Sequence, residues 1–448
     1  MRVAGGRVSA AALLFAGTLV AGADQAAAQE ESLPTLEFSF SNPGARSMGF
    51  GGAFVALADD ATAAFANPAG LVQLLEPEVS IEGRSWSYST PYVEGGRFFG
   101  APSGQGLDTS AGLRIGESSA ELSGLSFVSL VYPGRDWSVA FYRHQLASYE
   151  FFGEAGAIFA GPWPGVPGSR ARSGDLRKSF SMDVVGYGIS GAYRVTDWLS
   201  LGFGLSYFEG RAAWLSEVFA AYPGEPPTDA DFYQAQSGFA PEMLVSTSSS
   251  SWTDSHDFSG LAGLLLQPSE RWSLGVVLRD SPELEGTSEV VAGPMNDSYP
   301  SGALVQSGSG AIRLPSVLGV GAAFRSQDDR LTIGFEWDRV SYSEILESTG
   351  ASPEFVLGDG DELHVGAEYT FVRAQPIAAV RLGAWLDPAH RVDYRGEDWI
   401  ARAVLDSGSD EIHLAAGFGL AFERFQIDIG VDLADLADTA SLSAIYSF

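Results

Sequence analysis

The chain has 448 residues, no cysteine, 54 glycines and 12% aromatic residues, and its mean hydropathy is close to zero (+0.06). Its formal charge of −30 disfavours nucleic-acid binding, because the phosphate backbone binds basic surfaces. The length suits two or three soluble domains or one large barrel. Near-neutral hydropathy with abundant glycine and aromatic residues favours barrel strands that are apolar on one face only.

The first 28 residues have the pattern of a signal peptide. Arg2 and Arg7 precede an uncharged run over 8–23, which is too short for a membrane-spanning helix, and Ala26-Ala27-Ala28 offers a cleavage site before Gln29. The mature protein is therefore expected to be exported. The lack of cysteine agrees with passage through an oxidising compartment.

Residues 29–77 are expected to form a plug. The part from 42 to 75 is apolar but not strand-like, because its glycines and prolines predict turns, and Asp59-Asp60 predicts the cap of a short helix over 60–66. An apolar segment outside the strands must be buried, and the lumen of a large barrel needs filling. We therefore expect this segment inside the barrel, with Asn67-Pro68-Ala69 at or near the wall.

From residue 78 to residue 448 the chain alternates between apolar and small or polar residues at the strand period. This pattern predicts an all-β, antiparallel transmembrane barrel of about fourteen strands, an even number as a closed bacterial barrel requires. Six tight turns alternate with seven mostly longer connections, as short periplasmic turns alternate with long outer loops. The predicted strands are 78–89, 122–133, 137–153, 178–195, 198–212, 255–267, 272–282, 311–326, 331–343, 362–372, 377–387, 410–423, 425–433 and 440–448.

Aromatic residues mark the predicted strand ends. Trp137, Trp198 and Trp272 each follow a tight turn, as girdle residues at a membrane–water interface do. The last strand ends in Phe448 after alternating apolar residues, a pattern typical of the signal read by the barrel assembly machinery. The expected location is the outer membrane, in contact with lipid and lipopolysaccharide, and we expect a monomer.

The segment before the barrel resembles the FadL-type family of outer-membrane transporters of long-chain fatty acids and hydrocarbons. The stretches 258–280 and 314–344 also look like central hairpins of that family. The resemblance implies a fourteen-stranded barrel, an N-terminal hatch, and passive diffusion of hydrophobic small molecules sideways through a kinked third strand. The residues of the hatch motif are Gly44, Ala45, Arg46, Gly49, Gly51, Gly52, Asp59, Asp60, Asn67, Pro68 and Ala69.

A second family has a comparable glycine-rich segment ending in Asn-Pro-Ala. It comprises the barrel subunits of type IX secretion that are similar to PorV. A barrel that binds a protein partner through its long acidic loops therefore remains the alternative. An open general porin is disfavoured by the apolar plug segment.

No catalytic, metal or cofactor site is predicted. The five histidines lie in no nucleophile motif and at no metal-ligand spacing. A calcium site in the acidic loop 358–362 is less favoured than a plain solvated loop.

Luminal arginines offer a possible ligand site. By alternation Arg279, Arg325 and Arg381 face the lumen, and the favoured interpretation is that they pair with luminal acids and anchor the plug. The alternative is that one of them binds a ligand carboxylate while the ligand's tail lies on plug residues. The plug residues meant are Phe50, Phe54 and Phe65.

The third strand is where the alternation fails. If Trp137 and Phe141 face lipid, Arg143 does too, near the middle of the membrane and at a cost on the order of 2–4 kcal/mol. Snorkelling of Arg143, or a bulge after Phe141 that turns it inward, would relieve that cost. Because the family that the chain resembles has a kinked third strand, we predict a bulge or kink between about 142 and 156 that opens the wall beside the plug.

Overall fold

The computed structural model describes residues 42–102, 111–156, 158–160, 171–172, 174–220, 239, 241–398, 401–402, 405 and 408–448. The predicted signal peptide and the segment 29–41 lie outside these residues. No helix in the described part of the chain is long and apolar enough to cross a membrane.

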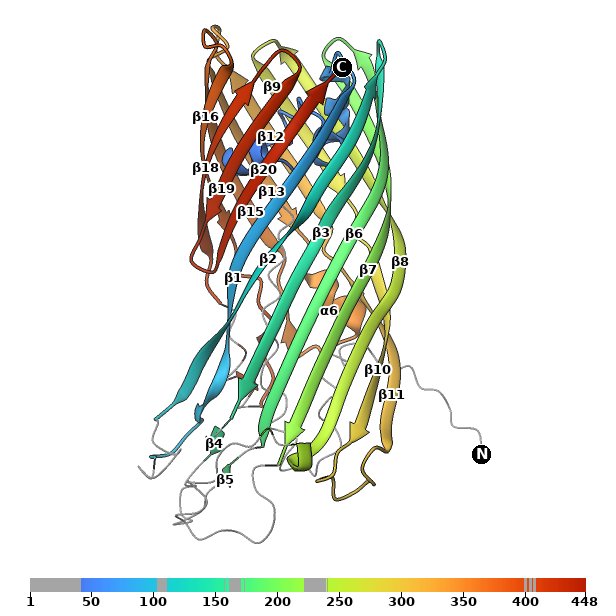
Figure 1. The fold of residues 1–448 in the computed structure, drawn as a ribbon, viewed down its shortest axis with the longest axis vertical. Coiled ribbons are helices and arrows are strands. Elements are labelled where there is room, and N and C mark those ends of the chain that lie inside the picture. Colours follow the sequence, from blue (N-terminus) through green and yellow to red (C-terminus); the bar gives the residue numbers. More distant parts are fainter. Residues whose placement is uncertain are drawn as a thin grey trace, which may run out of the picture.

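Fourteen antiparallel strands close into one barrel, in which the first strand pairs with the last (Figure 1). The predicted fold class and strand number are confirmed, and the first strand begins at Glu78 as expected. In order around the wall the strands are β1 (Glu78–Arg97), β2 (Leu113–Pro133), β3 (Trp137–Ala155), β6 (Asp175–Thr196), β7 (Leu199–Phe219), β8 (Leu244–Ser269), β9 (Trp272–Arg279), β12 (Val317–Arg325), β13 (Leu331–Val340), β15 (Gly360–Phe371), β16 (Ile377–Asp387), β18 (Glu411–Ala421), β19 (Phe425–Leu433) and β20 (Ala437–Ser447).

Several strands run on past their predicted ends. Figure 1 shows β1–β3 and β6–β8 reaching well beyond β18–β20. The predicted outer loop 283–310 is largely a hairpin, β10 (Glu283–Ala292) with β11 (Leu304–Arg313), and β10 pairs with the outer part of β8. The strand pattern did not predict these outer parts, because their residues are mostly polar. For example, β8 contains the run Ser248–Ser251.

Short elements lie among the outer connections. They are β4 (Ile158–Ala160), β5 (Ala171–Arg172), η3 (Pro241–Met243), α6 (Ser343–Thr349), β14 (Phe355–Val356) and β17 (Asp393–Tyr394).

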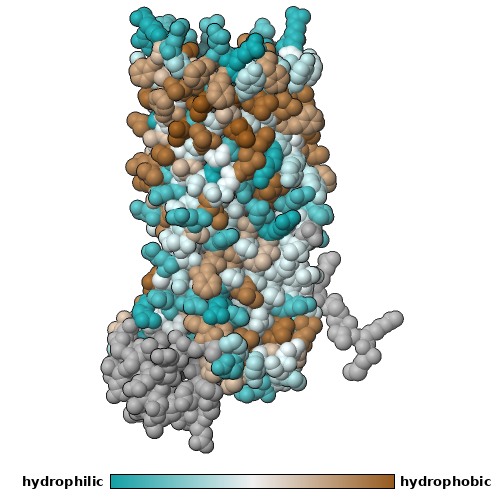
Figure 2. Space-filling model, viewed as in Figure 1, coloured by the Kyte–Doolittle hydropathy of each residue, from teal (hydrophilic) through white to brown (hydrophobic). Residues whose placement is uncertain are grey.

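The outer surface carries an apolar band. Figure 2 shows hydrophobic residues gathered over the half of the visible wall that bears the short turns. The three turn-adjacent tryptophans are about half exposed, Trp137 at 48%, Trp198 at 53% and Trp272 at 52%, on the outer face. Large exposed apolar side chains suit lipid and not water. The barrel therefore spans a membrane, and the predicted aromatic girdle is confirmed.

The plug lies inside the barrel near the short turns, as predicted (Figure 1). It contains the helices α3 (Ala45–Gly49), α4 (Ala63–Ala66) and η2 (Pro68–Gln73). The helix expected over 60–66 covers only 63–66, because the Asp60 carboxylate accepts the backbone N–H of Thr62 (2.9 Å) and stabilises a turn there. The plug contacts every one of the fourteen strands.

Inward-facing glycines of the wall form the socket for the plug. Gly417 lies against Gly49, and Gly366 lies so close to Phe50 that a Cβ at position 366 would be 2.0 Å from the Phe50 carbonyl oxygen. The small residues that alternate with apolar ones along these strands therefore face inward to admit the plug backbone.

Candidate transport site: plug, window and cavity

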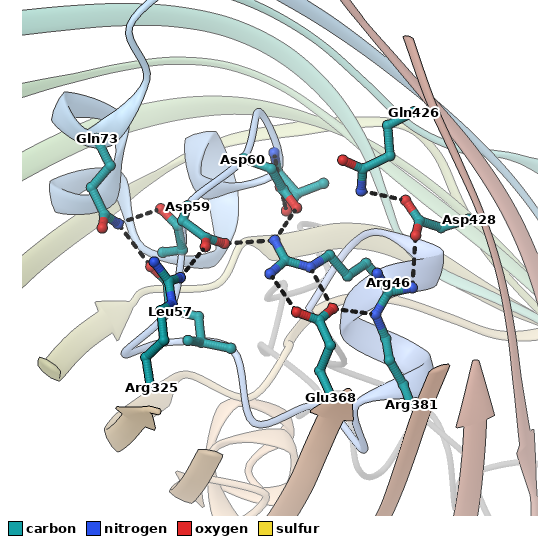
Figure 3. A network of polar contacts seen from close by, with 12 residues as sticks. Arg46, Leu57, Asp59, Asp60, Gln73, Arg325, Glu368, Arg381, Gln426 and Asp428 are labelled. Carbon is teal, nitrogen blue, oxygen red and sulfur yellow. Dashed lines mark hydrogen bonds and ion pairs between the residues drawn. The ribbon is translucent and has the colours of Figure 1, made fainter. Parts of the chain in front are cut away.

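An ion-pair network fixes the plug to the wall (Figure 3). The Arg46 guanidinium of α3 lies 2.6 Å from Asp59, 3.4 Å from Asp60 and 3.2 Å from Glu368 of β15. Arg381 of β16 binds the same Glu368 (2.6 Å) and also Asp428 of β19 (2.7 Å). The hatch-motif residues Arg46, Asp59 and Asp60 are therefore charge anchors of the plug.

Opposite charges favour the ionised forms of Arg46 and Asp59 despite burial, whereas burial prevails at Asp60. Burial opposes the charge on Arg46, but its three acidic neighbours outweigh that effect and raise its pKa well above the usual value. Burial would also raise the pKa of Asp59, but Arg46 and Arg325 hold that pKa below its ordinary value. For Asp60 burial prevails over Arg46, so its pKa is raised.

All three predicted luminal arginines contact the plug or its network. Arg279 donates to the Asn42 side-chain oxygen (2.5 Å) and to the Ala66 carbonyl (3.1 Å). Arg325 lies 3.1 Å from Asp59, and Arg381 is the network member described above. These contacts support the interpretation that the arginines anchor the plug.

The predicted ligand-contacting phenylalanines are buried within the plug–wall interface. Phe50 is 2% exposed and Phe54 is 1% exposed, and both pack in one small apolar cluster of the plug. Phe65 is 7% exposed and packs on His144 of β3, with ring centroids 4.1 Å apart. None of the three lines the cavity described below.

The Asn67-Pro68-Ala69 motif lies at the wall, as expected. The Asn67 amide donates to the carbonyls of Val55 in the plug (2.9 Å) and Leu264 in β8 (3.2 Å). Its oxygen accepts the N–H of Ala69 (3.1 Å) and so caps η2. Ala69 lies against Gly202 of β7.

The wall has an interruption between β2 and β3. Their ladder runs from Pro133–Ser138 to Phe127–His144 and ends there, although β2 continues to pair with β1 and β3 with β6. Both strands bulge at this level, since Ser126 is an extra residue opposite β1 and Leu146 is an extra residue opposite β6. The predicted irregularity of the third strand is confirmed, and it is matched by one in the second strand.

Arg143 marks the inner edge of this interruption. The bulge comes after Arg143 and not before it, so the alternative in which a bulge directly after Phe141 turns Arg143 inward is wrong. Arg143 keeps the outward register, and its guanidinium donates to the Leu125 carbonyl of β2. The guanidinium of Arg143 thus has a hydrogen-bond acceptor, and the Leu125 carbonyl, near the end of the ladder, has a donor.

Side chains of β1 and β2 contact the backbone of β3 again farther out. The Glu150 N–H of β3 donates to the Tyr88 hydroxyl of β1 (2.5 Å), and the Phe152 N–H donates to the Ser118 hydroxyl of β2 (3.0 Å). The interruption is therefore bounded at both ends. We call the space between the ladder end at Phe127–His144 and the Ser118–Phe152 contact the window.

A cavity of about 110 Å³ lies behind the window. Its near side is formed by both bulges, through Ser126 and the stretch 145–148, and its far side by strands β16, β18 and β19. A volume of this order compares with the ~150 Å³ of an apolar cavity that admits benzene. The aromatic residues that line it are Trp86, Tyr88 and Trp385.

The charges around the cavity are mainly negative. Asp387, Glu411 and Asp432 line it together with Arg84 and His413. Arg84 is 3.0 Å from Glu82, and His413 is 3.3 Å from Asp432. Both basic side chains of the lining therefore lie beside acids, and the three carboxylates of the lining outnumber them.

The acidic loop 358–362 makes ion pairs. Asp359 and Asp361 lie 3.2 Å and 2.8 Å from the guanidinium of Arg339. These exposed pairs agree with a solvated loop.

The closed barrel, its lipid-facing band and its luminal plug define an outer-membrane channel fold. No family model and no curated protein matches the chain. Among solved structures, the chain is similar to a FadL homologue of Pseudomonas aeruginosa (15% identity, TM-score 0.62, 93% of this chain and 99% of that chain). It is also similar to the CymD monoaromatic hydrocarbon channel (17%, 0.56, 92% and 99%) and to the toluene transporter TodX of P. putida (16%, 0.57, 92% and 99%). These likenesses establish the shared fold.

Sequence reasoning found the plug anchors and the irregular strand but missed the cavity. Its lining comes from β1, β2 and β3 and from β16, β18, β19 and β20, which are distant in sequence. One of the five histidines, His413, lines the cavity.

Proposed function

We propose that this protein admits neutral hydrophobic small molecules through the outer membrane by passive diffusion. The molecule passes from the outer side of the lumen into the cavity and leaves sideways into the membrane through the window. The plug stays in place, because its charged anchors and glycine socket hold it to the wall.

This proposal rests on one observation, that the cavity lies directly behind the window. Both bulged residues, Ser126 and Leu146, belong to the cavity lining and to the strands that part. An apolar molecule that leaves there enters lipid directly and never has to cross the plug. The similar structures include a monoaromatic hydrocarbon channel and a toluene transporter, which agrees with a neutral cargo.

The charge of the cavity favours neutral molecules over fatty-acid anions. An anionic headgroup would face Asp387, Glu411 and Asp432, and the nearby Arg84 is already paired with Glu82. At an effective dielectric constant near 20, two like charges ~10 Å apart repel by about 1.7 kcal/mol. Hydrocarbons and other uncharged apolar compounds do not meet this barrier.

Deletion of Leu146 tests the route. Gln145 and Ala147 already pair with the adjacent residues Val185 and Val184, so removal of the bulged residue leaves the β3–β6 ladder regular. A straight β3 can extend its ladder with β2 and close the window. We expect uptake of labelled toluene by intact cells to fall to the level of a deletion strain, while the barrel still folds and keeps its heat-dependent gel mobility.

The matched control deletes Val195, which is the extra residue of a bulge in β6 beside a short turn and far from the window. This variant should retain uptake. Toluene uptake that survives deletion of Leu146 in a folded barrel would refute exit through the window.

The protein-partner alternative has no support from any feature of the described residues. Assembly by the barrel machinery, a monomeric state and contact with lipopolysaccharide remain parts of the proposal.

A further inference from the structure

A cluster of buried acids surrounds His364 on the luminal face of β13 and β15. Glu336 lies directly across from His364 in the ladder, and Asp338 lies across from Glu362. Like charges directly opposite each other in a sheet are destabilising. The cluster therefore needs a positive charge.

The plug and outer side chains already satisfy part of this cluster. Both oxygens of Glu336 accept from the plug, one from the Asn42 amide (3.1 Å) and one from the Val55 N–H (2.6 Å). One oxygen of Glu362 is 3.4 Å from the Tyr342 hydroxyl. Asp338 is only 6% exposed, and its Oδ1 has no hydrogen-bond partner among the described residues.

The orientation of His364 is fixed by the plug. Its Nδ1 is 2.9 Å from the Gly51 carbonyl oxygen, which can only accept, so Nδ1 carries the proton. Nε2 therefore points at two carboxylates, 3.3 Å from Glu362 Oε2 and 3.9 Å from Asp338 Oδ2. A histidine that donates one N–H to a backbone carbonyl and directs its other nitrogen at carboxylates has the arrangement of a metal ligand.

The spacing of these atoms suits a metal ion. One atom from each of Asp338, Glu362 and His364 lies within 4.8 Å of the other two. Ligands at ~2.1 Å in a tetrahedral site are about 3.4 Å apart, close to the distance between His364 and Glu362. One imidazole with two carboxylates is a donor set that zinc accepts, whereas magnesium and calcium prefer oxygen alone.

We propose that Asp338, Glu362 and His364 bind one divalent zinc ion inside the barrel. The ion neutralises the buried acids and holds the His364 ring against the Gly51 carbonyl, which makes it a latch between wall and plug. The approach of the plug requires glycines here, because Gly51 and Gly52 have φ of 69° and 82° and a Cβ on Gly52 would be 2.8 Å from His364 Nδ1. Trp385, which stacks on His364 with ring centroids 5.1 Å apart, also lines the cavity, so the proposed site lies beside it.

The test is zinc binding by the full-length barrel, purified in detergent without a histidine tag and stripped of metal. Equilibrium dialysis with ZnCl₂ should give one ion per chain. His364→Gln and Asp338→Asn should each weaken binding by at least about 100-fold. Zinc should raise the unfolding temperature of the wild-type barrel and leave that of His364→Gln unchanged.

His413→Gln is the matched control, because His413 also stacks on Trp385 but directs its two nitrogens at different carboxylates. It should bind zinc as the wild type does. A Cu²⁺-loaded sample should show the electron paramagnetic resonance hyperfine pattern of a single imidazole nitrogen, and His364→Gln should lose it. Binding of clearly less than one zinc ion per wild-type chain would overturn the proposal. An equal loss of zinc binding in His364→Gln and His413→Gln would also overturn it. A protonated His364 would then be the cation that balances the acids.

Discussion

The glycine socket predicts that one added methyl group will displace the plug. In Gly366→Ala the new Cβ would lie 2.0 Å from the Phe50 carbonyl oxygen and 2.5 Å from Phe50 Cδ1, whereas ordinary contact begins near 3.4 Å. The plug must therefore shift by more than 1 Å at this point. Overpacking of this kind costs about 1–3 kcal/mol, which raises the population of displaced plugs about 5- to 150-fold.

Ion conductance in planar bilayers and vancomycin sensitivity of whole cells measure this displacement. Both should rise in Gly366→Ala, because a displaced plug leaves a path for water and polar solutes. Gly260→Ala is the matched control: a Cβ there meets nothing within 4 Å, so its conductance should equal that of the wild type. Wild-type conductance and vancomycin sensitivity in a correctly folded Gly366→Ala barrel would refute the reasoning. An equal rise of both in Gly366→Ala and Gly260→Ala would refute it as well.

Three further predictions concern charge. Arg46→Ala removes one cationic partner from each of three buried acids, Asp59, Asp60 and Glu368, and should lower the free energy of unfolding by about 3–5 kcal/mol in denaturant titrations. Arg395→Ala, at a side chain 68% exposed, should change it by less than ~0.5 kcal/mol. Asp387→Asn should raise the ratio of oleate to toluene uptake by about tenfold, the effect of ~1.4–1.7 kcal/mol, and an unchanged ratio would contradict the proposed charge barrier. Since the pKa of Asp59 in the docked plug is below its ordinary value, its contribution should be complete above about pH 4 and lost as the pH falls through that lowered pKa. Conductance measured from pH 7 down to pH 3 should therefore rise only at the acid end, and a rise near neutrality would contradict this sign.

The sequence by itself determined the barrel and the presence of the plug. Alternation along each strand reports whether neighbouring residues face lipid or the lumen, and this information is local. The same alternation, violated at Arg143, predicted an irregular third strand together with the family resemblance. It failed where strands such as β8 continue beyond the lipid, because residues that meet water on the outside need not alternate in polarity.

Tertiary structure decided everything that depends on which strands meet. The bulge in β3 is at Leu146 and not directly after Phe141. It lies just beyond the point where the ladder between β2 and β3 ends. The luminal arginines contact the plug because turns bring its Asp59 and Ala66 to them. Asp338 and His364 are too far apart in sequence to show metal-ligand spacing, yet antiparallel register and the Gly51 carbonyl bring their side chains together. Contacts between strands depend on register and closure, which are properties of the whole chain and not of any local pattern.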